Sequence, residues 1–568
     1  MEKMNRQKIR KLVCLALAFM MALSLAACGG GGGSSTPPAG STGGDAPAST
    51  PAGDPSEAKG AQDLVLATYS DGHCYMDPHK TTSYFDYQVL NQTGDTLVTQ
   101  DFDGATIVPG LADSWEVSDD GLTYTFHLKQ NVKFHSGKAM TSADVKYTYD
   151  RWGAEETASQ TRSFVSRVDS IECPDDYTVV FNMSQPDNNF LVNLTVPVAI
   201  ILNEDAVKAA EDAGQVYGTE SHDGTGPFIF EEFIQSDSVR LVRNDEYAWG
   251  PACFENKGAA HLDSITWRFL PEPGTRLMEF RAGNVHILGN GSLLASELES
   301  VLASGDFRAE YFNPPYPVFI QFQLDHVTDI NVRRACNMAV DREEITNTVM
   351  AGIADPMVGA LPSHYKWYWD GADNYYPYDR EAAGQLLEDS GYKLESDGFR
   401  YKDGEKLTID IMFCSSDEDK MTAELFQAQM LEIGVDITVN TAMVSNFWSH
   451  INTNEFDTLI MGLYINSPED MLYEYMSTNN LPFPNRQGFS DPEVDELLGK
   501  ALSTADEAER QACYDRVQEI AMEQAMWVPL YNRNSFIPVS NKVQGLRCHP
   551  TIVEGEPKML DVYIDDTK

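Results

Sequence analysis

Apolar and polar residues alternate in two short stretches near the start of the folded part of the chain. Residues 114–118 place Trp115 and Val117 on one face, which is the pattern of a half-buried strand. Residues 123–128 repeat the alternation, and Asp120-Gly121 between the two stretches favours a tight turn, because glycine accepts a positive φ. The pattern therefore predicts a β-hairpin.

Helical spacing follows this hairpin. Thr141 precedes Asp144 by three residues, which is the spacing of a capping box. Val145, Tyr149 and Trp152 then fall on one helical face. A capped amphipathic helix is therefore predicted after the hairpin.

Strand-like and helix-like stretches continue to alternate, which indicates an α/β layer with crossover connections. Apolar or alternating runs predict strands at 64–69, 262–269, 318–324, 407–413 and 435–439. Helical spacing predicts helices at 275–283 and 331–350, and a later helix that begins with a capping box at Ser490 and Glu493.

The first 61 residues differ in composition from the rest. A basic start precedes the apolar run Leu12–Leu25, which is short for a spanning helix. The run ends in Leu-Ala-Ala-Cys-Gly, which resembles a bacterial lipobox and predicts a lipoprotein signal peptide at 1–27 with lipidation of Cys28. Residues 28–61 are mostly Gly, Ser, Thr, Pro, Ala and Asp, so we expect a disordered tether.

Charge and cysteine content narrow the possible partners. The formal net charge of −45 argues against nucleic acid, because phosphate binding needs basic patches. Nine cysteines include no CxxC pair, and the seven beyond the signal peptide and lipobox are scattered singly. Such a set is typical of buried thiols rather than of a disulfide scaffold, with one or two bridges left open.

The amino-acid sequence of the hairpin–helix region is more specific than its alternation of apolar and polar residues. VPGLADSWEVSDDGLTYTFHLKQNVKFHSGKAMTSADVKYTYDR, residues 108–151, closely resembles the signature region of the family 5 extracellular solute-binding proteins. These are the peptide- and nickel-type receptors of bacterial ABC importers. Further blocks in the same order, including VRRACNMAVDREEI at 332–345, extend the resemblance over about residues 60–565.

The resemblance implies an α/β, two-lobed, periplasmic-binding-protein-like (class II) fold, with an extra decorating domain on the first lobe. Ligand would lie in a cleft between the lobes. The implied division places lobe 1 at 62–90, 223–312 and 525–568, the decorating domain at 91–222, and lobe 2 at 313–524. A monomer is implied on the extracytoplasmic face of the cell membrane, with a small solute and ABC permease subunits as its partners.

Catalytic and metal motifs are missing from the sequence. No HExxH, GxSxG, complete Walker loop or CxxC occurs, so we expect neither an enzyme nor a bound cofactor. His73, Cys74, Met76 and His79 stand close together, but their spacing fits no standard zinc pattern. A loop that leaves a strand is therefore predicted there, and no metal site.

The ligand anchors of dipeptide-binding relatives are altered in this chain. Those relatives hold the ligand's α-amino group with the Asp of a GWxxD passage and its carboxylate with an Arg. The matching passage is 462–466, with Leu463 at the Trp position and Asn466 at the Asp position; between 413 and 425 there is no Arg, and only Lys420 is near. Because Asn is only a neutral acceptor, we expect a longer peptide held mainly through its backbone.

Candidate ligand contacts are Tyr69 at the end of the first strand, Trp448, Tyr464 and Asn466 around the matching passage, and Trp367 in an aromatic run. The same aromatics also fit a loop that packs its rings onto the surface of a lobe. Three alternatives to a peptide receptor stay open: a receptor of the same fold for nickel, a metal chelate or another small solute; a secreted hydrolase; and an adhesin.

Overall fold

The structure is a computed structural model. It describes residues 60–69, 72–219, 222–414, 416–442, 447, 449–451, 453–465, 467–504, 506–550 and 555–568. The predicted signal peptide, Cys28 and the tether up to residue 59 lie outside the described residues, as do Trp448 and Asn466. No helix in the described ranges has the length and apolar character that crossing a membrane requires.

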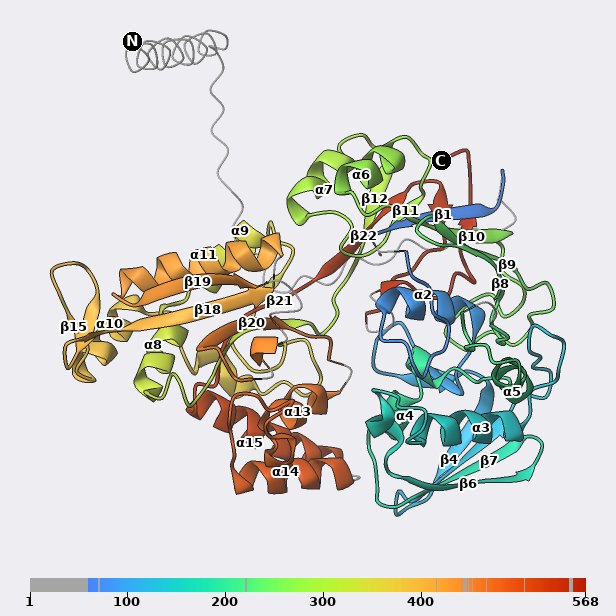
Figure 1. Ribbon diagram of the computed structural model, residues 1–568, viewed down its shortest axis with the longest axis horizontal. Helices are drawn as coiled ribbons and strands as arrows, with labels where there is room; N and C mark the ends of the chain where they lie inside the picture. The colour runs from blue at the N-terminus through green and yellow to red at the C-terminus, as the bar shows by residue number, and fades with distance from the viewer. Residues whose placement is uncertain are drawn as a thin grey trace, which may run out of the picture. The chain divides into compact units, whose positions relative to one another are not determined.

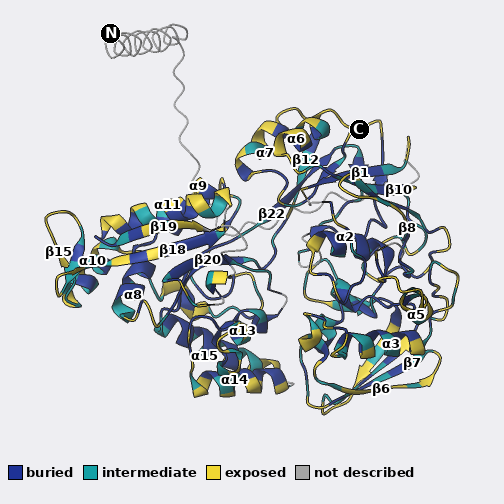
Figure 2. Ribbon diagram, viewed as in Figure 1, coloured by how far each residue is buried: buried dark blue, intermediate teal, exposed yellow. Residues whose placement is uncertain are grey.

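The first lobe is built on a seven-stranded sheet of order β12-β22-β11-β1-β10-β9-β8 (Figure 1). Its strands are β1 (Asp63–Thr68), β8 (Phe228–Ile234), β9 (Ser238–Arg243), β10 (Ser264–Phe269), β11 (Ile287–Leu288), β12 (Phe307–Phe312) and β22 (Ser535–Ser540). Alternate residues of β1 enter two cores, one shared with α2 (Tyr84–Thr93) and one with α6 (Pro273–Arg281) and α7 (Ala295–Leu302). Helices therefore cover both faces, and β22 is buried along its whole length (Figure 2).

The second lobe is built on a six-stranded sheet of order β14-β21-β13-β20-β18-β19. Its strands are β13 (Pro317–Phe322), β14 (Asp355–Pro356), β18 (Thr408–Cys414), β19 (Asp436–Ala442), β20 (Thr458–Gly462) and β21 (Trp527–Asn532). The helices of one face are α8 (Ile330–Ala339), α9 (Arg342–Val349), α10 (Arg380–Asp389) and α11 (Asp417–Glu432), and those of the other are α13 (Leu472–Met476), α14 (Pro492–Ser503) and α15 (Glu507–Glu523). Ile320 and Phe319, adjacent on β13, enter the two cores in turn.

The decorating domain is a four-stranded antiparallel sheet with helices. Its sheet has the order β4-β5-β7-β6, from β4 (Ala112–Val117), β5 (Thr123–Leu128), β6 (Val168–Asp175) and β7 (Thr178–Met183), and its helices are α3 (Ser142–Gly153), α4 (Phe190–Asn193) and α5 (Glu204–Asp212). The predicted hairpin is confirmed by the β4–β5 pairing. The capping box is confirmed too, since the Asp144 carboxylate accepts the Thr141 N–H at 3.0 Å.

Small ribbons complete the described strands: β2 (Val98–Gln100) with β3 (Ile107–Pro109), β15 (Lys393–Leu394) with β16 (Arg400–Lys402) and β17 (Glu405–Lys406), and β23 (Val543–Gln544) with β24 (Tyr563–Ile564).

Two predicted helix boundaries were wrong. The helix predicted at 331–350 is interrupted between α8 and α9, because the Asp341 carboxylate accepts the Glu344 N–H at 2.9 Å and starts a second helix. The cap of α14 is Asp491 rather than Ser490. Its carboxylate accepts the N–H of Glu493 at 2.8 Å, and Pro492 occupies the first helical position, which suits its fixed φ.

Two short crossovers join the sheets within the described chain. The first, residues 313–316, runs from β12 to β13, and the second, residues 533–534, runs from β21 to β22. The segment predicted for lobe 1 at 525–568 therefore spans both lobes. Its first strand, β21, pairs with β13 in the second lobe, whereas β22 pairs with β11 and β12 in the first.

Asn532 ties the two crossovers together. Its side chain, 1% exposed, donates to Asn313 Oδ1 at 2.6 Å and to the Pro314 carbonyl at 2.9 Å, and accepts the Tyr316 N–H at 2.8 Å. Arg533 adds a backbone hydrogen bond to the Tyr316 carbonyl at 2.9 Å. Asn532 Nδ2 also donates to Asn534 Oδ1 in the second crossover at 3.1 Å, so the amide bonds to both crossovers and fixes their spacing.

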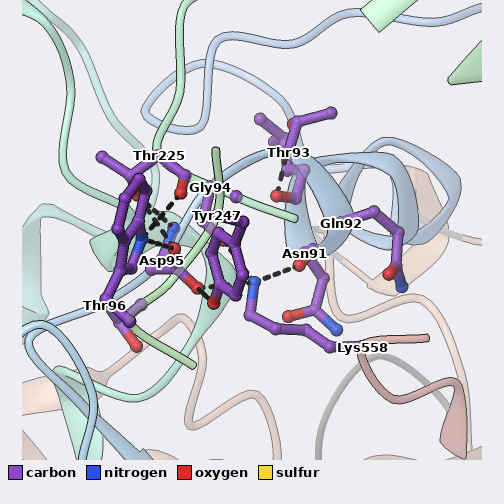
Figure 3. A network of polar contacts seen from close by, with 12 residues as sticks. Asn91, Gln92, Thr93, Gly94, Asp95, Thr96, Thr225, Tyr247 and Lys558 are labelled. Atoms are coloured by element: carbon purple, nitrogen blue, oxygen red, sulfur yellow. Dashed lines mark hydrogen bonds and ion pairs between the residues drawn. The ribbon is translucent and has the colours of Figure 1, made fainter. Parts of the chain in front are cut away.

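A buried ion pair attaches the chain's last segment to the first lobe and the decorating domain (Figure 3). Lys558 Nζ lies 3.1 Å from Asp95 Oδ1, with 9% and 2% of the two side chains exposed. The same ammonium donates to the carbonyls at the end of α2, and Asp95 also accepts from the side chains of Thr225, Tyr247 and Trp249. Every charge in this network is therefore hydrogen-bonded.

We expect Lys558→Met to lower the free energy of unfolding by about 3–5 kcal/mol, because it leaves the buried Asp95 carboxylate without its cation. Urea denaturation followed by tryptophan fluorescence measures the change. Lys542→Met is the matched control: its 3.1 Å pair with Asp566 is 45% and 50% exposed, so a loss of at most about 1 kcal/mol is expected. Equal losses in the two variants would contradict this account of the network.

Candidate ligand-binding site

A cavity of about 420 Å³ opens where two parallel strands of the second lobe diverge. β18 and β20 pair only through Ile411–Met412 and Thr458–Leu459. Beyond these residues, Cys414 and the end of β20 line the two sides of the cavity. In α/β proteins, ligands bind outside the carboxyl ends of strands, because neighbouring connections separate there and leave a crevice.

Both lobes and both crossovers contribute to this cavity. The second lobe supplies the first turn of α11, and the first lobe supplies Gly291 and Leu294 from the loop after β11. Tyr316 lies in the first crossover and Arg533 in the second, and both side chains line the cavity. A ligand held here would therefore contact each lobe and the segments that join them.

The charged groups of the cavity come from α11 and the second crossover. Arg533 Nη2 lies 3.0 Å from Glu418 Oε2, with 34% and 21% of the two side chains exposed. Burial acts against the charged guanidinium, yet Glu418 and nearby tyrosines raise the pKa of Arg533 above its usual value. Burial raises the pKa of Asp419 to about 6, against a hydrogen bond from Ser416 and the attraction of Arg533, and Glu418 adds to the rise.

Tyr464 links the lobes beside this cavity. Its hydroxyl accepts a hydrogen bond from Asn290 Nδ2 of the first lobe at 3.3 Å. Its ring centroid lies 4.6 Å from that of Tyr316 and 5.9 Å from that of Tyr84, at the start of α2. These aromatic contacts therefore cross between the lobes next to the charged groups.

The predicted contact residues take different places in the structure. Tyr69 is 52% exposed, and its ring lies 3.6 Å from the position that a Cβ on Gly291 would occupy, so it stands beside the cavity together with Tyr464. Trp367 is instead a core residue: it is 8% exposed, packs on Tyr514 and lies in the second lobe's hydrophobic core rather than among the cavity-lining residues. Trp448 and Asn466 lie outside the described residues.

The segment that holds His73, Cys74, Met76 and His79 is a loop, as the sequence predicted. His79 is 1% exposed, stacks on Trp152 and contacts Arg151, whose guanidinium binds both oxygens of Asp77 at 2.9 and 2.6 Å. Across the described ranges, no group of three or more His, Cys, Asp or Glu side chains is arranged to hold a metal ion. None of the seven cysteines of the described ranges forms a disulfide.

Sequence reasoning missed the charged residues of the cavity. It sought a carboxylate anchor between 413 and 425, but the guanidinium comes from Arg533 in the second crossover. Glu418 and Asp419 occupy the first turn of α11, where acidic residues commonly stabilise a helix start. Neither residue type nor spacing distinguishes such helix-start acids from cavity acids, so the sequence held no usable signal.

A second set of contacts joins the decorating domain to the second lobe. Asn188 Nδ2 donates to the carbonyls of Ala501 and Thr504, at the end of α14, at 3.0 and 2.7 Å. Asn189 Nδ2 donates to Glu469 Oε2 at 2.9 Å. We call these two asparagines the latch, because their hydrogen bonds cross from one lobe's decorating domain to the other lobe.

Comparison with known proteins supports the same fold and family. A family model described as bacterial extracellular solute-binding proteins, family 5 Middle, matches residues 106–483. The chain is 27% identical over 463 residues to Heme-binding protein A of Haemophilus influenzae, covering 77% of this chain and 81% of that protein. It is 25% identical over 573 residues to the Oligopeptide-binding protein AppA of Bacillus subtilis, covering 96% and 97%.

A solved structure extends the match to the whole fold. The ABC transporter-associated periplasmic binding protein DppA from Helicobacter pylori, in complex with the peptide STSA, superposes with a TM-score of 0.73 at 26% identity, covering 90% of this chain and 99% of that one. With two lobes, a decorating domain, a cavity at the carboxyl ends of its strands and a family match over most of its length, this chain belongs to the family 5 bacterial extracellular solute-binding proteins.

Proposed function

We propose that this protein captures oligopeptides in the cavity and delivers them to the permease of an ABC transporter for import. The observation that carries the proposal is a cavity lined by both lobes in a chain similar, over 90% of its length, to a protein solved with a bound peptide. The similarity to AppA over 96% of the chain adds to it. In this proposal the protein carries out no reaction on the peptide.

The sheet geometry suits a ligand held through its backbone. The β18–β20 ladder stops at Met412 and Leu459, so the facing edges of the two strands beyond it do not pair with each other. An extended peptide placed between them could run along both strands, which is how strand addition supplies affinity without charged anchors at each end.

A metal chelate or heme is the second candidate, because the chain also resembles Heme-binding protein A. A ligand of this kind needs no protein metal site, since it carries its own coordination. Native mass spectrometry of the full-length protein separates the two candidates: peptide masses are expected to co-purify, whereas a heme or metal mass would favour the alternative.

Cys414 offers a direct test, because its side chain lines the cavity. We expect a saturating mixture of short peptides to slow modification of Cys414 by a methanethiosulfonate reagent by about tenfold or more, since bound peptide excludes the reagent. Intact-mass kinetics measure the modification rate. The mass increase that is missing in the Cys414→Ser variant is the one that belongs to Cys414. Calorimetry that finds no heat with peptides, together with unchanged modification rates, would overturn the proposed function.

We also propose that Cys28 carries a lipid that anchors the protein on the outer face of the cell membrane, and that the protein works as a monomer. The support is the lipobox-like sequence Leu25–Gly29. We expect Cys28→Ala to move the protein from the membrane fraction to the soluble fraction, with Cys173→Ala as the control. A Cys28→Ala protein that stays in the membrane fraction would contradict lipid anchoring.

The latch favours the arrangement in which the two lobes are close together. Asn188→Ala removes two hydrogen bonds, each worth about 0.5–1.5 kcal/mol, and so should shift the ligand-free protein toward more open arrangements. We expect a larger radius of gyration by small-angle X-ray scattering and a peptide affinity weakened several-fold.

Asn182→Ala is the matched control for the latch, because that side chain bonds to Ser170 and Glu172 within the decorating domain and touches no other lobe in those contacts. If both variants scatter like the parent protein, the latch does not influence lobe closure.

A further inference from the structure

The cavity carries an excess of negative charge. Its lining includes the carboxylates of Asp417, Glu418 and Asp419 and one guanidinium, that of Arg533. When all four groups are ionised, the lining has a net charge of −2. A cleft lined mainly by charges of one sign focuses their field and raises the local concentration of oppositely charged ligands.

Stabilisation of the helix start does not account for these side chains. Ser416 already caps α11 by accepting the Asp419 N–H at 3.0 Å. A carboxylate that served only the helix would remain in water, but Glu418 reaches a different element at 3.0 Å and is 21% exposed. Burial disfavours the ionised form of Asp419. The desolvation of these acids therefore calls for a cation to offset it.

The one guanidinium of the lining is already engaged. Glu418 already neutralises much of the charge of Arg533, so a ligand carboxylate would gain less from that guanidinium, whereas a ligand ammonium could approach Asp419 or Asp417 without breaking an ion pair. Tyr316, Tyr531 and Phe447 also line the cavity, and aromatic faces attract cations. The negative charge and the aromatic rings of the lining both favour a cationic ligand.

We propose that the cavity selects ligands with a cationic side chain, such as that of lysine, and that Asp419 is the residue that binds it. This inference rests on the proposed function, because it names the peptides that the cavity prefers. Glu418 has a different role. Its ion pair with Arg533 reduces the attraction of the guanidinium for acidic ligands.

Calorimetry with three peptides tests the preference: Lys-Ala-Ala, Ala-Ala-Ala and Glu-Ala-Ala, each with the full-length protein in mild detergent. We expect affinity to fall in that order, with about a tenfold or larger difference between the first and the last, as charge-assisted hydrogen bonds imply. Asp419→Asn should shrink this ratio by about threefold or more. Glu424→Gln, on the same helix but 57% exposed and outside the lining, should leave it unchanged.

Acid should weaken the same interaction. Asp419, with its pKa of about 6, faces Glu418 and Asp417 on α11 and Arg533 on the second crossover. As the pH falls from 7.5 to 5, Asp419 takes up a proton and loses the charge that attracts the ligand's cation. The affinity for Lys-Ala-Ala should therefore drop across this range, and Asp419→Asn should flatten the drop. An unchanged pH profile in that variant would contradict the role of Asp419.

A ligand-free measurement keeps the inference testable if no peptide binds. Cys414 in the cavity is modified in parallel by a cationic and an anionic methanethiosulfonate, with rates normalised to those for 2-mercaptoethanol. We expect the cationic reagent to be favoured by about threefold or more, and less so in Asp419→Asn. If no peptide binds but the cationic reagent still reacts faster than the anionic one, the peptide function is overturned and the charge preference stands. Equal rates for the two reagents, or tighter binding of Glu-Ala-Ala than of Lys-Ala-Ala, overturn the charge preference.

Discussion

The side-chain amide of Asn532 is the contact on which the relation between the two lobes depends. In the described chain the sheets are joined by two short crossovers, and this buried amide bonds to both, to Asn313 in the first and to Asn534 in the second. Tyr316 and Arg533 flank it, one on each crossover, and both line the cavity. The segments that connect the two lobes are thus the same segments that form part of the cavity lining.

Two ion pairs in the protein differ in how far they are buried, and this difference matches their roles. Asp95 and Lys558 are almost fully buried and surrounded by hydrogen-bonding partners, so their pairing holds three chain segments in one arrangement. Glu418 and Arg533 are partly exposed, and their attraction is weakened by nearby water. The first pair suits a permanent attachment, and the second suits a site whose partners can exchange.

Local patterns were sufficient for much of the fold. Alternation and a glycine turn predicted the β4–β5 hairpin, and the Thr141 and Asp144 spacing predicted the start of α3, because each depends on residues close in sequence. The missed boundaries at Asp341 and Asp491 involve a choice between neighbouring polar residues as helix caps, which periodicity alone does not make.

The site was harder to predict because its parts come from distant segments. Glu418 meets Arg533 only because β18 and β21 belong to one sheet, and a pattern read along the chain does not contain that pairing. Tyr69 and Tyr464 could be proposed because both follow strands, whose carboxyl ends tend to gather around a ligand. Trp367 had no such position, and its aromatic neighbours fit a core equally well.

The latch joins the residues just before α4 to the end of α14, and in Figure 1 these two helices lie well away from β21 and β22, which the second crossover connects. That placement gives it leverage. A rotation of a few degrees about the crossovers displaces atoms near the axis very little but moves the distant asparagines much farther, and a hydrogen bond tolerates only a few tenths of an ångström of stretch. A small opening of the lobes would therefore break these hydrogen bonds while the cavity near the crossovers changed little.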